Sequence, residues 1–418
     1  MLISLIIPTR ERASFLAECL RTAVGIPDER IEIIVSDNAS TDGTRAVVEA
    51  VPDRRVRYLN TGSRVAMRQN FEFALQHANG DYVCFIGDDD GFLPGQFAGL
   101  RAVLESRRPE VLAWRPLMYG WPIPGFGRRV GGVRFHAERM YEPVGAVDLR
   151  PARERLLRAD LAALGPSPSI YHGCASRAYL DHMRGFGGQT FGARSPDVYL
   201  SYFTILTRDS FLYTHHPFSV NGYSPVSTGN AHHAYRSGDA RSRPATQFGA
   251  EGATDPVQDA IHEYALSLAL NLFGTYETVR RNLPAPPADD RVAWYRYVLT
   301  QTDRADHDAW SATGRILDAH AARTGTTEAL AAARRAGAGA PSAAKATGAL
   351  RKLVSNVTSI KCSAAMDGRN TVHTAALMAD AVLGDAFVRS SASTRRAPGT
   401  WPAAWARAAR RNLTRARA

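Results

Sequence analysis

Cysteine and lysine are both scarce in this chain. Only three of its 51 basic residues are lysine, a bias that goes with a GC-rich genome and not with a particular function. The four cysteines form no CxxC pair and do not cluster with histidine, which argues against a zinc site and against a disulfide framework. We therefore expect reduced thiols in a cytosolic protein. The cysteines are Cys19, Cys84, Cys174 and Cys362.

Long apolar runs are also missing. No segment approaches the roughly 20 apolar residues that a membrane span requires. Residues 1–8 are too short for a signal peptide and have no basic flank, so they are expected to form a strand. The net charge of +11 is uneven, because residues 389–418 contain eight arginines and no acidic residue. A basic surface over the folded domain, which a nucleic-acid-binding protein needs, is therefore not indicated.

Glycine-rich phosphate loops are absent as well. The turn after the first apolar run reads Pro8-Thr9-Arg10-Glu11, where a dinucleotide-binding fold would have Gly-x-Gly-x-x-Gly. The Gly-x-x-x-x-Gly-Lys-Ser/Thr motif of P-loop NTPases does not occur either. A phosphate group would have to be held by a metal ion and arginine.

Three consecutive carboxylates are the most informative feature that is present. Asp88, Asp89 and Asp90 follow the apolar segment 82–86 after a single glycine, Gly87. Charges this close repel one another unless a cation or strong hydrogen-bond donors compensate them. Carboxylate oxygens suit Mg²⁺ or Mn²⁺, which commonly bind together with substrate phosphates. The cluster predicts a metal–diphosphate site, with a solvated acidic turn as the alternative.

The hydrophobic pattern of residues 1–115 predicts the fold class. Short apolar runs alternate with amphipathic stretches of helical length, which is typical of an α/β protein with a doubly wound, mostly parallel sheet. Ligands of such sheets bind at the carboxyl ends of the strands. The expected strands are residues 2–7, 31–35, 56–59, 82–86 and 110–114, and the expected helices are 14–24, 44–51, 65–78 and 93–106.

The remaining sequence suggests additions to this core. We expect one catalytic domain over residues 1–235, with a nucleotide-binding half (1–115) and an acceptor half (116–235). A helical extension follows over 255–335, with a helix at 255–283 and a linker at 284–290. Residues 336–418 are rich in Ala and Arg. At their end, 400–417 predict an amphipathic helix that lies on an anionic membrane surface or docks on its own domain.

Three segments together resemble glycosyltransferase family 2, the inverting enzymes of the GT-A fold. They are residues 8–11, 35–43 and 87–90, and the resemblance covers about residues 1–110 well and 165–230 loosely. It implies transfer of a sugar, in the manner of a hexosyltransferase, from a nucleoside-diphosphate donor to a hydroxyl group. The expected donor is a UDP-sugar, and the expected cofactor is Mn²⁺ or Mg²⁺. A non-catalytic protein that binds sugar nucleotides is the alternative.

The resemblance implies a class of acceptors, and the reduced thiols together with the C-terminal tail imply a place in the cell. The acceptor would be a saccharide, a lipid-linked sugar or a small molecule, as in the synthesis of cell-surface polysaccharides or glycolipids. The protein would be cytoplasmic, in peripheral contact with the inner face of the plasma membrane.

The resemblance assigns roles to residues of the donor half. Pro8, Thr9 and Glu11 match the loop around the nucleoside, and Asp37 matches the carboxylate that accepts a hydrogen bond from the uracil N–H. Arg68 matches a position near the diphosphate, with a surface arginine as the alternative.

Two further positions fit the same pattern. Asn70 belongs to the Arg-x-Asn motif that starts at Arg68 and lies near the diphosphate and base in the family. Asp42 lies in a Ser-x-Asp-Gly sequence and could equally be a helix cap.

The acidic motif departs from the family at one position. The family has Asp-x-Asp after the strand, and Gly87 stands where its first aspartate would be. We expect Asp89 to bind the metal, with Asp90 as a second candidate ligand and Asp88 or Asp90 near the ribose. The alternative is a shifted motif in which Asp88 and Asp90 serve.

Inverting transfer requires a base on the acceptor side. Asp197, at the start of an apolar helix, resembles the family's base, although a charge that stabilises a helix N-terminus is the alternative. Asp209 is the second candidate. A histidine from His215-His216 or His232-His233 is a further candidate for the metal, with loop or acceptor-contact residues as the alternative. Tyr171-His172-Gly173 is a candidate for the acceptor pocket, with a structural histidine as the favoured alternative.

Overall fold

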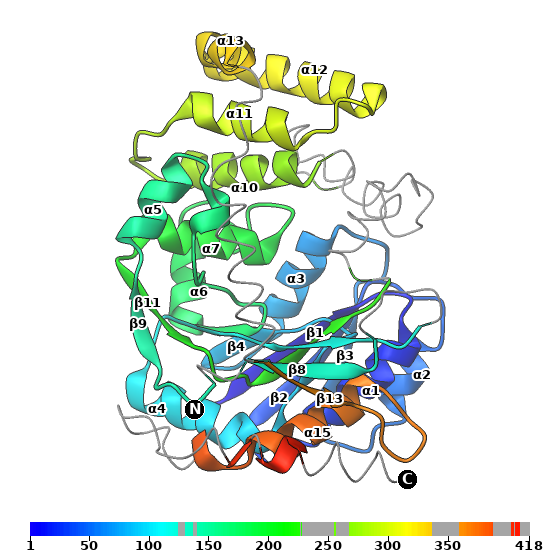
Figure 1. Ribbon diagram of the computed structural model, residues 1–418. Coiled ribbons are helices and arrows are strands. Elements are labelled where there is room, and N and C mark those ends of the chain that lie inside the picture. The colour runs from blue at the N-terminus through cyan, green and yellow to red at the C-terminus, as the bar shows by residue number, and fades with distance from the viewer. Residues whose placement is uncertain are drawn as a thin grey trace.

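The computed structural model describes residues 1–123, 130–136, 140–225, 227, 255, 267–336, 359–387, 403–404 and 406–409. Two sheets and the helices around them form the body of the molecule, and a stack of helices stands on one end (Figure 1). The expected helices of the tail, the loop that contains His232-His233, and residues 256–266 of the helix expected at 255–283 lie largely or wholly outside the described residues.

The eight-stranded sheet has the order β3-β2-β1-β4-β10-β6-β11-β9. Its first four strands are parallel, as the sequence predicts: β1 (Ile3–Thr9), β2 (Ile31–Asp37), β3 (Val56–Asn60) and β4 (Tyr82–Phe85). β1 and β2 are in register up to their last residues, which pairs Thr9 with Asp37. The segments singled out by sequence therefore meet at one edge of the sheet.

Helices cover both faces of this sheet. Ile3, Leu5 and Ile7 of β1 pack in a core with α1 (Ala13–Val24) and α4 (Phe97–Arg107). Ile6 faces the other core, which includes α3 (Met67–Gln76), α6 (Arg177–Arg184) and α7 (Pro196–Thr207). Near-continuous apolar runs such as that of β1 are what a parallel sheet with both faces buried requires. The short helix α2 (Thr44–Glu49) follows β2.

The second sheet, of order β13-β8-β7-β12-β5, continues from the acidic motif. β5 (Gly91–Phe92) directly follows Asp90 and pairs antiparallel with β12 (Ser219–Tyr223). This pairing brings the turn after β12 next to the three aspartates. The other strands of this sheet are β7 (Leu117–Gly120), β8 (Gly132–His136) and β13 (Ser359–Ser363).

Three of the four remaining strands of the large sheet come from the acceptor half, and the fourth, β6, ends the donor half. β10 runs antiparallel to β4 and β6, whereas β11 is parallel to β6. The bounds are β6 (Val111–Trp114), β9 (Gly145–Asp148), β10 (Gly173–Ser176) and β11 (Ser210–Thr214), with α5 (Arg150–Leu157) and the 3₁₀ turns η1 (Pro94–Gln96) and η2 (Leu161–Ala163) between strands.

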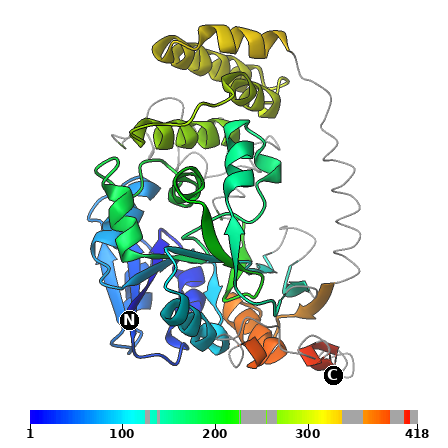
Figure 2. The ribbon, with the colours of Figure 1, turned by 90° about the vertical axis from the view of Figure 1, so that its left-hand side faces the viewer.

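The helical extension stands on the acceptor half. α10 (Leu268–Asn282) packs on α7, and α11 (Arg291–Gln301), α12 (His307–Thr324) and α13 (Thr327–Arg335) continue the stack (Figures 1 and 2). Ser267, Asp290 and Asp306 cap α10, α11 and α12. The proline-rich linker expected at 284–290 connects α10 to α11.

The C-terminal region returns to the far end of the molecule (Figure 2). α15 (Val372–Leu383) packs against α1. Ala404 and Ala408 are fully buried, and Arg407 donates to the carbonyl oxygens of Val382 and Leu383 at 2.8 and 2.9 Å. The described part of the expected tail helix therefore docks on its own domain. Among the described residues, no helix has both the length and the apolarity to span a bilayer.

Candidate active site

Asp88 lies at the end of β4 and contacts the loop after β1. Thr9 Oγ1 donates to Asp88 Oδ2 at 2.7 Å, and Arg12 Nη1 donates to Asp88 Oδ1 at 3.0 Å. Asp88 is almost fully buried. Although burial lowers the pKa of Arg12, the charges of Asp88 and Asp89 outweigh it and raise that pKa. The predicted nucleoside loop and the acidic motif are thus directly connected.

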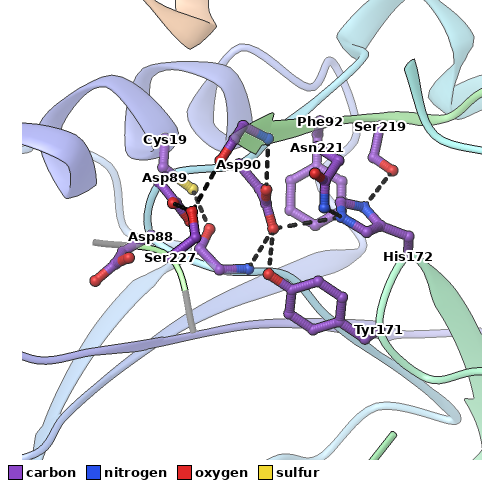
Figure 3. A network of polar contacts seen from close by, with 12 residues as sticks. Cys19, Asp88, Asp89, Asp90, Phe92, Tyr171, His172, Ser219, Asn221 and Ser227 are labelled. Atoms are coloured by element: carbon purple, nitrogen blue, oxygen red, sulfur yellow. Dashed lines mark hydrogen bonds and ion pairs between the residues drawn. The ribbon is translucent and has the colours of Figure 1, made fainter. Parts of the chain in front are cut away.

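Asp89 faces the turn after β12 (Figure 3). Ser224 Oγ and Ser227 Oγ donate to Asp89 Oδ2 at 2.6 and 2.5 Å. Burial raises the pKa of Asp89 to about 7, and the neighbouring charge of Asp90 adds to the effect. Two hydroxyl donors do not fully compensate the charge of a buried carboxylate. A bound cation would therefore stabilise the ionised form of Asp89.

Asp90 is held from three sides. Tyr171 Oη and Gly87 N–H donate to its Oδ2 at 2.5 and 2.8 Å, and Gly222 N–H donates to Oδ1 at 2.7 Å. His172 Nε2 lies 3.4 Å from Oδ2 (Figure 3). Both oxygens of Asp90 therefore already accept hydrogen bonds. Tyr171, an expected acceptor-pocket residue, instead joins the acidic motif.

Two glycines allow this close packing. A Cβ on Gly222 would lie 1.7 Å from the carbonyl oxygen of Asp89, so no side chain fits there. A Cβ on Gly87 would lie 2.5 Å from Tyr171 Oη and 3.0 Å from Asp89 Oδ1. There is thus a steric reason for the absence of the family's first aspartate: the Tyr171 hydroxyl occupies the space that its side chain would need.

Asp37 is fully buried at the end of β2. Its carboxylate accepts from Ser40 N–H at 3.0 Å, from Tyr58 Oη at 2.6 Å and from Asn60 Nδ2 at 3.2 Å. These donors come from β3 and from the loop after β2. They fix the carboxylate at the same sheet edge as Thr9.

Glu11 ties the loop after β1 to the loop after β2. Its backbone has a positive φ of 52°, and its carboxylate accepts from Thr41 N–H at 2.9 Å and from Arg64. Burial raises the pKa of Glu11, but the hydrogen bonds from Thr41 and Arg64 outweigh it and lower that pKa. Pro8 precedes Thr9 on β1 and pairs with Ser36 of β2.

Asp42 and Asn70 have structural partners. Asp42 is the N-cap residue of neither helix, but it accepts from the first N–H of α1, that of Ala13, at 3.0 Å and from the first N–H of α2, that of Thr44, at 2.9 Å. The helix-cap interpretation of Asp42 therefore accounts for its position. Asn70 exchanges hydrogen bonds with Ser36 across the core, at 2.6 and 3.1 Å.

Arg68 forms a buried, two-point ion pair. Its Nε and Nη2 each donate to a different oxygen of Asp255 at 2.6 Å, and its Nη1 donates to the carbonyl oxygen of Phe191 at 3.2 Å. Both side chains are almost fully buried. The surface-arginine alternative is wrong, and a contact with a diphosphate would require this pair to separate.

Asp197 and Asp209 lie at opposite ends of α7. Asp197 is in the first turn and partly buried, and burial raises its pKa, although hydrogen bonds from its own N–H and that of Val198 oppose the shift. Asp209 follows the helix, is 85% exposed and pairs with Arg153 at 3.3 Å. Because burial raises its pKa, Asp197 is the better candidate for the general base.

His216 and His172 both contact side chains of the protein that account for their positions. His216 is fully buried, stacks on Phe387 with ring centroids 3.8 Å apart, and lies 3.0 Å from Gln96 Oε1. His172 lies 2.8 Å from Ser219 Oγ and 3.0 Å from Asn221 Nδ2, which places it behind Asp90 (Figure 3). Among the described residues, no group of three or more His, Cys, Asp or Glu side chains is arranged to hold a metal by itself.

Residues 4–142 match the family model described as glycosyl transferase family 2. The predicted resemblance to glycosyltransferase family 2 is confirmed for this part of the chain. The α/β fold, with its large mixed sheet and the helices on both faces, agrees with the expected GT-A type. The match covers about a third of the chain and includes all three segments that meet at the sheet edge.

Two curated relatives show the same similarity. The chain is 34% identical over 101 residues to a GalNAc(5)-diNAcBac-PP-undecaprenol beta-1,3-glucosyltransferase from Campylobacter jejuni, covering 23% of this chain and 33% of that protein. It is 34% identical over 112 residues to the abequosyltransferase RfbV of Salmonella typhimurium, covering 26% and 34%. The matches span about a third of the length of these relatives.

Similar solved structures are more distant in sequence. Staphylococcus aureus TarS 1–349 in complex with UDP-GlcNAc is 17% identical, with a TM-score of 0.43 over 79% of this chain and 89% of that one. The mannosyltransferase PcManGT from Pyrobaculum calidifontis, in complex with GDP-Man and Mn²⁺, is 20% identical, with a TM-score of 0.36 over 79% and 85%.

Sequence reasoning missed several members of the site. Arg12, Ser224 and Ser227 bind the acidic motif, and the Gly222 N–H supports Asp90. Their signal in the sequence is weak, because they are remote from Asp88–Asp90 along the chain. Only the pairing of β12 with β5 brings the serines and Gly222 to the site.

Proposed function

We propose that the chain is a metal-dependent, inverting glycosyltransferase that moves a sugar from a nucleoside-diphosphate donor to an acceptor hydroxyl. The observation that carries the proposal is the position of Asp88–Asp90. They end a buried strand within the family 2 region, at the sheet edge where Thr9 and Asp37 also lie. The expected donor is a UDP-sugar.

Asp37 is the proposed contact for the base of the nucleotide. A carboxylate offers about four acceptor positions. At Asp37 three of them are occupied, by donors from Ser40, Tyr58 and Asn60. The remaining position suits the imide N–H of uracil. Pro8, Thr9 and Glu11 would line the nucleoside, and Asp88, held by Thr9, would face the ribose.

The residues of the acidic motif fit a divalent cation of the Mn²⁺ or Mg²⁺ type. Asp89 has a buried carboxylate whose pKa is raised despite the nearby charge of Arg12, and two serine hydroxyls donate to it, so a cation would compensate its charge. Because such ions commonly bind through one or two carboxylates and substrate phosphates, a three-ligand protein cluster is not required. When bound, the ion would neutralise charge on the leaving diphosphate.

Asp89 is the better placed of the two candidate ligands. Both oxygens of Asp90 accept hydrogen bonds from Tyr171, Gly87 and Gly222, which suits a group that fixes the backbone around Asp89. Arg68 would approach the diphosphate only if Asp255 released it on donor binding.

Asp197 is the proposed general base. The acceptor oxygen would attack the anomeric carbon as the bond from that carbon to the diphosphate breaks, and its proton would pass to the Asp197 carboxylate. A base works best when its pKa lies near the working pH, and burial shifts the pKa of Asp197 upward. Attack from the face opposite the diphosphate inverts the configuration.

The names of two relatives support the proposed acceptor class. One of them carries a PP-undecaprenol-linked saccharide in its name and another is an abequosyltransferase. We propose that this chain likewise acts in the synthesis of a surface polysaccharide or glycolipid, from the cytoplasmic side of the membrane.

A thermal-shift titration tests the proposal. UDP, GDP, CDP and dTDP are each added with and without Mn²⁺. A ligand at about 100 times its dissociation constant stabilises the folded state by about 2.7 kcal/mol, which a melting curve resolves. A metal-dependent shift with one nucleotide is the expected result. Failure of all four would overturn the donor site, and binding without sugar transfer or donor hydrolysis would favour the non-catalytic alternative.

A further inference from the structure

A basic cavity lies in the helical extension, between the C-terminal parts of α10 and α12. Its volume is about 360 Å³. The polar side chains that line it are mostly cationic or hydroxylic: Thr278, Arg280, Arg281, His320, Arg323 and Thr324. It belongs to the stack of helices above the acceptor half, not to the sheet edge that carries the acidic motif (Figure 1).

The charge of the cavity is positive. Three arginines line it, and the acidic lining residue Glu277 already has its own cations. Glu277 pairs with Arg291, and His320 Nε2 lies 3.2 Å from its Oε2. Burial raises the pKa of Glu277, but these two partners outweigh it and lower that pKa. Arg280 Nη1 lies farther from this carboxylate, 3.9 Å from Oε1, so Arg291 and His320 provide its nearer partners.

Arg280 supplies a second observation. Its Nε is buried and has no hydrogen-bond partner among the described residues. Its Nη1 lies 3.3 Å from Asp289 Oδ2, and its Nη2 donates to the carbonyl oxygen of Pro287 at 3.0 Å. A buried N–H of a charged group without an acceptor costs free energy, and a bound anion would recover it if the Arg280 side chain turned its Nε toward the cavity.

We propose that this cavity binds a phosphate group of a phosphorylated ligand. Guanidinium groups present planar, paired donors that match phosphate oxygens, and they stay charged at any working pH. The volume exceeds that of one phosphate, so it also holds part of the group to which the phosphate is attached.

Arginines in the last turns of α10 and α12 would also stabilise helix C-termini without any ligand. That role accounts for the residue type. It requires neither a cavity of this size nor a buried, unpaired donor at Arg280, both of which a ligand explains.

The cavity is connected to the acceptor half through α10. Asn271 of α10 donates to Ser195 Oγ at 2.8 Å, two residues before Asp197, and Asn282 donates to Tyr199 Oη at 3.0 Å. The inference goes beyond the proposed sugar transfer, because it does not depend on the chemistry at the sheet edge.

Isothermal titration of the full chain with inorganic phosphate tests this site, with sodium chloride at matched ionic strength as the reference. The double variant Arg281→Gln/Arg323→Gln removes two exposed cavity arginines. The matched control, Arg315→Gln/Arg335→Gln, removes two exposed arginines of the helical extension, one on α12 and one on α13, that do not line the cavity. We expect phosphate binding to weaken by about tenfold or more in the cavity variant and to remain unchanged in the control.

Equal phosphate binding in wild type and cavity variant, or no binding by wild type, would overturn the site. UDP binding, measured on the same variants, reports separately on the donor site. Vesicles that contain phosphatidylglycerol then identify the source of the phosphate. Binding that the cavity variant loses indicates a lipid phosphate, and phosphate binding without vesicle binding indicates a soluble one.

Discussion

The hydroxyl oxygen of Tyr171 lies 2.5 Å from the point where a side chain on Gly87 would place its Cβ. The same hydroxyl donates to Asp90 at 2.5 Å. Position 87 is where the family has the first carboxylate of its Asp-x-Asp motif. The glycine and the tyrosine therefore form one unit: a side chain at 87 and the hydroxyl at 171 exclude each other.

Replacing Gly87 with Ala is expected to destabilise the protein by about 1–3 kcal/mol, because the new methyl group overlaps the Tyr171 hydroxyl. Tyr171→Phe removes that hydroxyl together with its hydrogen bond to Asp90. In the double variant Gly87→Ala/Tyr171→Phe the overlap is gone. Its loss of stability should therefore be smaller than the sum of the losses measured for the two single variants. Urea unfolding of the four proteins gives this coupling energy.

Gly145→Ala is the control for this cycle. No atom lies within 4 Å of the Cβ it would add, and Gly145 has no positive φ. Its stability should stay within about 0.5 kcal/mol of wild type. Strict additivity between Gly87→Ala and Tyr171→Phe would show that the two positions do not compete for space.

Arg68 and Asp255 yield a prediction that separates stability from donor binding. Arg68→Met leaves a buried, unpaired carboxylate and is expected to cost about 3–5 kcal/mol, whereas Arg68→Met/Asp255→Leu should recover most of that loss. Chemical denaturation measures both. UDP binding by the stable double variant then decides the role of Arg68. Binding equal to that of wild type would contradict a contact with the diphosphate.

Asp197 and Asp209 provide a matched pair on one helix. Asp197→Asn is expected to lower kcat by about 10² to 10⁴-fold, because the acceptor proton loses its base. Its UDP binding should be unchanged. Asp209→Asn, at the exposed end of α7, should leave kcat within twofold or so of wild type, in line with a surface substitution. Steady-state kinetics with donor and acceptor distinguish the two, and an active Asp197→Asn enzyme would remove Asp197 from the mechanism.

His216 predicts a loss of stability in acid. Burial lowers its pKa from 6.5 to about 3. The unfolded state binds a proton to this histidine at higher pH than the folded state does. The free energy of unfolding is therefore unaffected by the protonation of His216 above pH 6.5 and decreases progressively as the pH falls from 6.5 toward 3. Between pH 7.5 and 5 the loss is about 2 kcal/mol.

The measurement is urea unfolding at both pH values for wild type and His216→Phe. The phenyl ring can still stack on Phe387, and it cannot take up a proton. The pH dependence of this variant should be smaller by the amount above, whatever its absolute stability. His182→Phe, which removes an exposed imidazole, is the control. Equal pH dependence of wild type and His216→Phe would contradict the prediction.

The donor half was predictable because its signals are local. Apolar runs and helical periodicity between residues 1 and 115 predict four of the parallel strands and the helices between them, and strand ends bring Thr9, Asp37 and Asp88 together. The doubtful position was Gly87. Tyr171 explains why a glycine stands there, because its hydroxyl occupies the space of a side chain at position 87. Tyr171 is remote in sequence and reaches the acidic motif because it lies just before β10, which pairs antiparallel with β4.

The partners of the acidic motif could not be predicted for the same reason. Ser224 and Ser227 follow β12, which pairs with a two-residue strand, β5, too short for any periodicity. Arg68 has a polar, charged side chain that reads as a surface residue, and its burial depends on Asp255, 187 positions away. The C-terminal region offered an Ala- and Arg-rich composition, which does not indicate that β13 completes a sheet with β8.

The most direct test of the proposed donor site is the Mn²⁺ dependence of UDP binding by wild type and by Asp89→Asn, measured by isothermal titration. The substitution keeps the size of the side chain and removes its charge. Asp181→Asn, an exposed position on α6, is the matched control. We expect Mn²⁺ to strengthen UDP binding by wild type and by Asp181→Asn, and to have no effect on Asp89→Asn. An Asp89→Asn protein that binds UDP with the wild-type dependence on Mn²⁺ would contradict the account.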